Sequence, residues 1–106
     1  MPDMPTIITL CGSSRFRDEF IEVNRNLTLA GNIVISVGLF GHHEESFDMN
    51  SRTKIMLDEL HKRKIDLADE IFVVNVGGYI GRSTQDEIRY AIAHGKRVRF
   101  LEPTEG

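Results

Sequence analysis

The sequence predicts a small α/β protein built on a doubly wound parallel sheet of about four strands, with helices on both faces. Short runs rich in β-branched residues alternate with segments whose apolar residues recur at helical spacing, and this alternation is typical of parallel sheets. The run 71–76 is apolar except for Asn75, as expected for a strand buried on both faces. The length of 106 residues predicts a single domain spanning 1–106.

The composition is that of an ordinary folded protein and argues against several classes of function. Hydrophobic residues make up 41% of the chain and charged residues 27%, which disfavours disorder. The single cysteine, Cys11, has no partner for an internal disulfide and favours a cytoplasmic location. No apolar run approaches the roughly 20 residues that cross a bilayer, and the first residues lack a signal-peptide pattern. Thirteen basic against sixteen acidic residues leave no positive field for a nucleic acid polymer.

The first half of the chain predicts a strand, a helix, a second strand and a long loop. Gly12 ends the first β-rich run, and the helix that starts near Phe16 stops at Gly31. The core-facing residues of this helix recur at spacings of four, three and four; they are Phe16, Phe20, Val23 and Leu27. The two strands and the polar loop are expected at residues 6–11, 32–37 and 38–52.

The second half predicts a helix, a strand, a helix and a final strand. The later helix is expected to begin at Ser83, where Asp86 completes a capping-box pattern, and to end at Gly95. In chain order the four elements are expected at residues 52–68, 71–76, 83–94 and 98–101, with a glycine-rich turn at 77–81. Right-handed crossovers between parallel strands then place the loops that follow the strands at one edge of the sheet, where ligands bind in this architecture.

The first candidate site at this edge is the turn from Gly12 to Arg15. A Gly-Ser-Ser turn between a strand and a helix presents backbone N–H groups at the positive end of the helix dipole, which suits a phosphate or carboxylate. Arg15 can add a bidentate contact to such an anion. In the alternative interpretation, Ser13 or Ser14 only caps the helix.

The second candidate is the glycine turn at 77–81 with the helix that follows it. Gly78 and Gly81 allow a ligand to approach the backbone, and Ser83 opens a further helix N-terminus. Glu87 is expected in the first turn of that helix, facing the same edge as Ser13. A carboxylate there can act as a nucleophile or stabilise a cationic sugar centre. Alternatively, it only favours the helix N-terminus electrostatically.

The polar loop at 38–52 contains a cluster of histidine and acidic residues that has both a functional and a structural interpretation. The loop residues His42, His43, Glu44, Glu45 and Asp48 are metal-ligand types, but adjacent residues rarely converge on one ion, so a polar surface loop or a lid over a ligand is expected instead. We therefore predict no metal and no cofactor.

Lys64 interrupts the expected apolar stripe of the helix at 52–68, which comprises Leu57, Leu60 and Leu67. Its ammonium either extends to solvent over a buried stem or adds positive charge to the cleft. Cys11 is interpreted as a small buried residue at a strand end.

Two segments together resemble a known family. The loop from Cys11 to Arg15 is similar to the Cys-Gly-Ser-x-Arg loop of the deoxynucleoside 5′-monophosphate N-glycosidases. The Ala68-Asp69 pair before a strand, and Glu87 after a glycine turn, resemble a second pattern of these enzymes. They belong with the nucleoside 2-deoxyribosyltransferases, which share a flavodoxin-like sheet.

The resemblance implies that Glu87 attacks C1′ of a (deoxy)ribose, so that water completes hydrolysis or a second base completes transfer. It also implies that the phosphate or the sugar is held by Ser13, Arg15, Gly81 and Ser83. The expected substrates are nucleoside 5′-monophosphates or nucleosides, and a homodimer or higher homo-oligomer is expected because exposed sheet edges remain and family members complete their pocket with a second subunit.

The chain departs from the family pattern at three positions. Thr9 stands where the family has an active-site tyrosine, His61 where it has a catalytic aspartate, and Arg89 where it has a glycine. His61 and Lys64 are therefore possible supporting residues only. These departures keep a second hypothesis open, in which the chain is a non-catalytic nucleotide-binding module or sensor that uses the same cleft.

Overall fold

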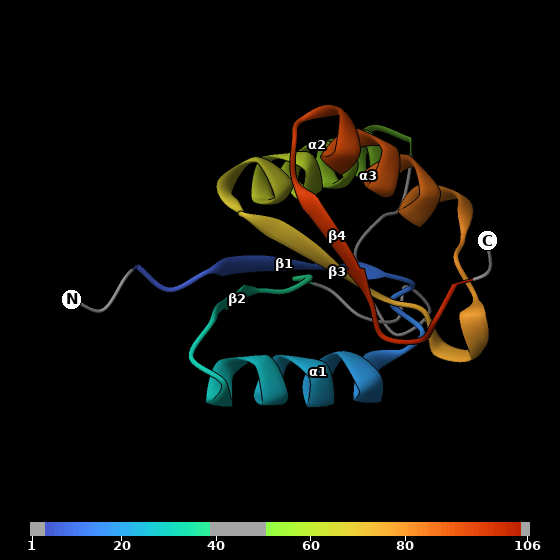
Figure 1. The fold of residues 1–106 in the computed structure, drawn as a ribbon. Coiled ribbons are helices and arrows are strands. Elements are labelled where there is room, and N and C mark those ends of the chain that lie inside the picture. The colour runs from blue at the N-terminus through green and yellow to red at the C-terminus, as the bar shows by residue number, and fades with distance from the viewer. Residues whose placement is uncertain (1–3, 39–50, 105–106) are drawn as a thin grey trace.

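A computed structural model describes residues 4–38 and 51–104. In this part of the chain, four parallel strands form one sheet in the order β2-β1-β3-β4 (Figure 1). The strands are β1 (Ile7–Gly12), β2 (Ile33–Ile35), β3 (Glu70–Val74) and β4 (Arg97–Phe100). The helices are α1 (Arg17–Leu29), α2 (Ser51–Leu67) and α3 (Arg82–Ala93), and a short 3₁₀ turn, η2, covers Val76–Gly78. The predicted doubly wound α/β fold is confirmed.

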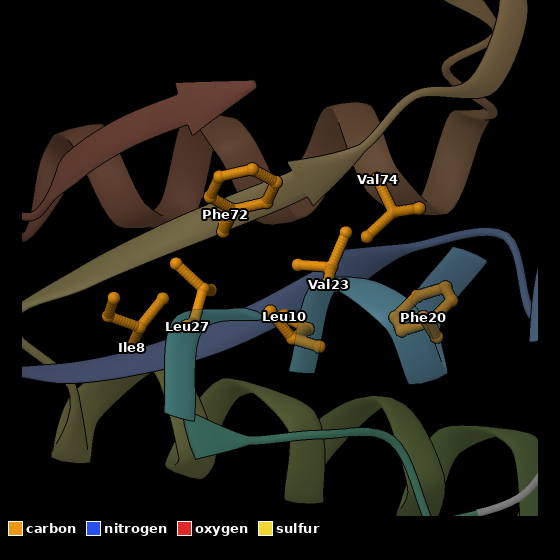
Figure 2. Packing of buried hydrophobic residues seen from close by; sticks show 7 residues of the cluster. All are labelled: Ile8, Leu10, Phe20, Val23, Leu27, Phe72 and Val74. Carbon is orange, nitrogen blue, oxygen red and sulfur yellow. The ribbon is translucent and has the colours of Figure 1, made fainter. Parts of the chain in front are cut away.

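Helices cover both faces of the sheet, α1 on one and α2 with α3 on the other (Figure 1). Successive side chains of a strand point to opposite faces, so β1 and β3 each contribute to two cores. The core on the α1 face, shown in Figure 2, consists of Ile8, Leu10, Phe20, Val23, Leu27, Phe72 and Val74. The core on the opposite face consists of Cys11, Ile65, Ile71, Val73 and Ala91. Both central strands are therefore buried on both sides.

The strand order creates a switch point between β1 and β3. The chain leaves β1 through α1 to reach β2 on one side, and later enters β3 on the other side of β1. Gly12 at the end of β1 pairs with Val74 at the end of β3. The loops that leave these two strand ends diverge to opposite faces, and such a divergence opens a crevice in this fold class.

Three local predictions were wrong. Glu87 was expected in the first turn of α3 but lies in its second turn. The helix α3 starts at Arg82 with Gly81 as its N-cap, and its N-cap makes no side-chain hydrogen bond, so the capping box of Ser83 and Asp86 does not form. The expected core stripe of α2 is also wrong: Leu60 and Leu67 are 50% and 67% exposed, whereas Ile65 is fully buried. The helix is rotated so that Ile65 packs on the sheet, where Thr9 Oγ1 donates a 2.8 Å hydrogen bond to the carbonyl of Lys64.

Gly12 is required at the end of β1. Its φ is +147°, and a Cβ at this position would lie 2.9 Å from the carbonyl oxygen of Val74. We expect Gly12→Ala to lower the free energy of unfolding by about 2–4 kcal/mol, through backbone strain and the clash. Urea denaturation followed by circular dichroism measures it. The control is Gly38→Ala, since no described atom lies within 4 Å of that site and its φ lies outside the positive range. Equal stability of the two variants would contradict the close approach.

Candidate functional site

A cleft of about 640 Å³ opens beyond the carboxyl ends of β1 and β3, between the loop after β1 and the helices α2 and α3. It lies at the switch point where this architecture binds ligands. Seven residues that the sequence singled out line it: Gly12, Ser13, His61, Lys64, Gly81, Ser83 and Glu87. Arg15 and Gly78 do not line it. Three segments that are far apart in the sequence thus meet at one site.

One wall of the cleft comes from α2 and was not expected from the sequence. Lys54, Leu57, Asp58 and Leu60 line it, and Tyr79 lines it from the glycine turn. The first four precede His61 at helical spacing and so share one side of α2 with it. That spacing is visible in the sequence, where it predicts that Leu57 and Leu60 face the protein core. They give the cleft an apolar wall instead.

The loop after β1 is organised around Ser13. Ser13 Oγ accepts hydrogen bonds from the backbone N–H of Arg15 at 3.3 Å and from Arg15 Nε at 3.1 Å. The N-cap of α1 is Phe16 and makes no side-chain hydrogen bond, so neither serine caps the helix. The guanidinium of Arg15 lies 4.6 Å from the ring centroid of Tyr79. Arg15 therefore joins this loop to the glycine turn beside the cleft.

The glycine turn begins after Asn75, which is fully buried and whose carbonyl accepts a 2.9 Å hydrogen bond from the backbone N–H of Gly78. Its side chain donates to the carbonyl of Glu102 at 3.0 Å and accepts from the backbone N–H of Glu102 at 2.9 Å. Gly77 and Gly78 have φ values of +64° and +83°, which favour glycine. Gly78 thus shapes the turn, whereas Gly81 at the start of α3 faces the cleft.

Three polar side chains meet at the floor of the cleft. Cys11 Sγ lies 3.3 Å from His61 Nε2, and His61 Nε2 lies 3.6 Å from Glu87 Oε1. Cys11 is fully buried, while the side chains of His61 and Glu87 are 12% and 18% exposed. The sequence predicted that Cys11 is buried but not that its sulfur contacts other polar groups. We call these three residues the floor cluster.

Burial sets the protonation of the floor cluster. It raises the pKa of Glu87 to about 7, although a hydrogen bond with Cys11 opposes the shift and the charge of Asp58 adds to it. Burial, with the charge of Lys64, lowers the pKa of His61 to about 4. Burial and then Glu87 raise the pKa of the Cys11 thiol well above its usual value. Between about pH 4 and about pH 7 the three side chains are therefore uncharged.

Lys64 extends toward the cleft. Its Nζ donates a 3.0 Å hydrogen bond to the carbonyl of Ser36, just after β2, and Lys64 lines the cleft. Of the two alternatives, the cleft-facing one agrees with this position. A second cation, Lys54, is paired with Asp58 at 3.2 Å. The cleft therefore offers positive charge on α2 beside the buried carboxyl of Glu87.

Among the described residues, the floor cluster is also the group whose atoms could hold a metal ion, since its three ligand atoms all lie within 4.8 Å of one another. The loop residues His42, His43, Glu44, Glu45 and Asp48 lie outside the described residues.

Comparison with known protein families, curated proteins and solved structures found no match for this chain. None of the described helices is long and apolar enough to cross a membrane.

The raised pKa of Glu87 predicts a pH-dependent stability. The folded protein keeps the Glu87 proton up to about pH 7, whereas the unfolded chain loses it near the usual value of 4.5. The contribution of this group to stability is thus fully present below pH 4.5 and is lost as the pH rises to 7. Relative to Glu87→Gln, the wild-type free energy of unfolding should fall by on the order of 3 kcal/mol across this window. Urea denaturation at several pH values checks this. If the free energy of unfolding depends on pH in the same way in both proteins, burial does not destabilise the charged carboxylate of Glu87.

Proposed function

We propose that the protein is an N-glycosidase or deoxyribosyltransferase, similar to the nucleoside 2-deoxyribosyltransferases, that cleaves the base–sugar bond of nucleoside 5′-monophosphates or nucleosides. One observation carries the proposal: the carboxyl of Glu87 and the Gly12–Ser13 turn line the same cleft, although 74 positions separate Ser13 from Glu87. A nucleophile and an anion-binding loop at one switch point suit a substrate that has both a reactive sugar carbon and a phosphate.

In the proposed reaction, the Glu87 carboxylate attacks C1′ as the C1′–N bond breaks. The base leaves with the bonding electrons and takes a proton from solvent, and a sugar ester of Glu87 remains. Water then attacks C1′ and gives a proton to solvent, the ester bond breaks, and the Glu87 carboxylate is restored; attack by a second base gives transfer instead. The carboxylate also stabilises the cationic sugar that develops between these states. His61, 3.6 Å from Glu87, orients the nucleophile.

The 5′-phosphate is assigned to the loop after β1. This loop leads into the N-terminus of α1, where the helix dipole and the first N–H groups of a helix favour an anion. Arg15 belongs to this loop and can exchange its contact with Tyr79 for one with phosphate. Ser83 at the start of α3 supplies a further hydroxyl to the cleft. No dissociable cofactor enters this scheme.

The proposal includes a cytoplasmic homodimer or higher homo-oligomer. The strands β2 and β4 lie at the two edges of the described sheet. On α2, the apolar side chains of Ile55, Met56 and Leu60 are 67%, 49% and 50% exposed. Leu60 also lines the cleft, so a second subunit on this surface would close the cleft from outside.

Thr9 favours the second candidate function, a nucleotide-binding module or sensor without turnover. It stands where the family has its active-site tyrosine, but it is fully buried and its hydroxyl donates to the carbonyl of Lys64. The cleft therefore receives no phenol from β1. In this alternative, the nucleotide binds at the same place and is not cleaved.

Release of free base from a panel of nucleosides and their 5′-monophosphates, followed by chromatography, separates the two functions. We expect wild type to release base and Glu87→Gln to reduce the rate by at least about 10³-fold, because the nucleophile is lost. Asp86→Asn is the matched control, since Asp86 is an exposed neighbour on α3 that pairs with Arg89. Calorimetric binding without release by wild type would establish the sensor instead.

Arg15→Ala should raise KM for monophosphates by at least about 10-fold and leave KM for nucleosides nearly unchanged, because only the former carry the phosphate that the guanidinium contacts. Arg25→Ala is the control, since Arg25 is an exposed arginine further along α1. A similar rise for both substrate classes would show that Arg15 supports the loop and does not recognise phosphate.

A further inference from the structure

We propose that the floor cluster, Cys11, His61 and Glu87, is a binding site for a zinc ion. The three ligand atoms come from three different elements, β1, α2 and α3. Two of their separations are 3.3 Å and 3.6 Å, and all lie within 4.8 Å. Tetrahedral zinc with Zn–S near 2.3 Å and Zn–N or Zn–O near 2.1 Å places its ligand atoms about 3.3–3.6 Å apart. The side chains therefore already have nearly the spacing that a shared ion requires.

The site is rigid on its buried side. Cys11 belongs to a strand that is hydrogen-bonded on both sides and buried in the core with Ile65, Ile71, Val73 and Ala91. Its sulfur would therefore contact an ion from the side of the sheet. His61 and Glu87 line the cleft and would contact the ion from that side. An ion bound by all three would lie between the sheet and the cleft, so its fourth coordination position would face the cleft. Three protein ligands with one open position are typical of a zinc site that also binds water or a ligand.

The chemistry of the ligand set selects zinc over the common hard cations. Calcium and magnesium take oxygen ligands, and a thiolate with an imidazole suits softer ions. Zinc binding would release to solvent the thiol proton of Cys11 and any proton on the Glu87 carboxyl, while His61 binds as neutral imidazole. One thiolate and one carboxylate balance the two positive charges of the ion. The occupied site is then formally neutral, which suits a place shielded from water.

The zinc site stands on this geometry alone, but it has a consequence that rests on the proposed function. An ion bound to the carboxylate of Glu87 would withdraw negative charge from it and so weaken its attack on C1′. Zinc would therefore inhibit base release, and a chelator would restore it. Zinc binding and catalysis would then compete for the same side chain.

Cobalt(II) titration of the full chain, with absorption spectroscopy, tests the site directly. We expect one ion per chain, a thiolate-to-cobalt charge-transfer band and the strong visible bands of tetrahedral cobalt, all lost when zinc displaces it. Zinc affinity is measured by competition with a chromogenic chelator. Cys11→Ala, His61→Asn and Glu87→Gln should each weaken it by at least the roughly 10–100-fold that loss of an outer-shell partner costs, because each removes a direct ligand. His94→Asn is the control: it alters an exposed histidine that stacks on Tyr90, and should keep wild-type affinity.

Circular dichroism of each variant establishes whether it is folded. Because three different ligands are substituted, the test remains valid if one of the variants does not fold. Absence of the charge-transfer band in wild type would overturn the proposal. Wild-type affinity in Cys11→Ala and Glu87→Gln would also overturn it, and loss of affinity in His42→Ala or His43→Ala would then assign the ion to the loop. Base release is assayed separately with a chelator present. If the protein binds zinc but releases no base, the zinc site is supported and the proposed reaction is overturned. If it releases base but binds no zinc, the proposed reaction is supported and the zinc site is overturned.

Discussion

The parallel pairing of β1 with β3 in the middle of the sheet determines the rest of the structure. Both strands have neighbours on either side, and helices cover both of their faces. Alternate residues of β1 consequently have different roles: Leu10 fills the core beneath α1, whereas Thr9 and Cys11 contact α2. The same pairing aligns the ends of the two strands at Gly12 and Val74. The cleft opens where their two loops separate.

Much of the fold could be predicted from the sequence, because strand and helix periodicities depend on neighbouring residues. The face that α2 turns to the sheet could not. Apolar residues occur on two sides of this helix: Ile65 packs in the core, and Leu57 lines the cleft. An α-helix turns about 100° per residue, so a small error in rotation exchanges these roles. The sequence pattern does not distinguish apolar residues that face the core from those that line a cleft, so the two sets were interpreted as one stripe.

The parts of the candidate site that depend on topology could be predicted from the sequence, and the parts that depend on the rotation of α2 could not. Ser13, Gly81 and Glu87 follow from topology, since the ends of parallel strands meet at one edge. The contact between Cys11 and His61 spans 50 positions and depends on the rotation of α2, so no local spacing contained it. Once formed, this contact changes the chemistry of the site. Glu87 lies largely buried beside the neutral groups of Cys11 and His61, and this burial raises its pKa to about 7 although Lys54 opposes the shift.

The stacking of Arg15 on Tyr79 connects the loop after β1 with the turn after β3. Both side chains are exposed, and a cation–π contact of this kind contributes only about 0.5–1 kcal/mol. An arriving anion can therefore draw the guanidinium away at small free-energy cost, which leaves the ring of Tyr79 uncovered. Tyr79 also packs edge-on against Phe16 at the start of α1, so its position is kept when Arg15 moves. If the cleft binds the proposed anionic ligand, the charge of that ligand would displace the arginine, and the same event would expose an aromatic face on which a flat group can stack.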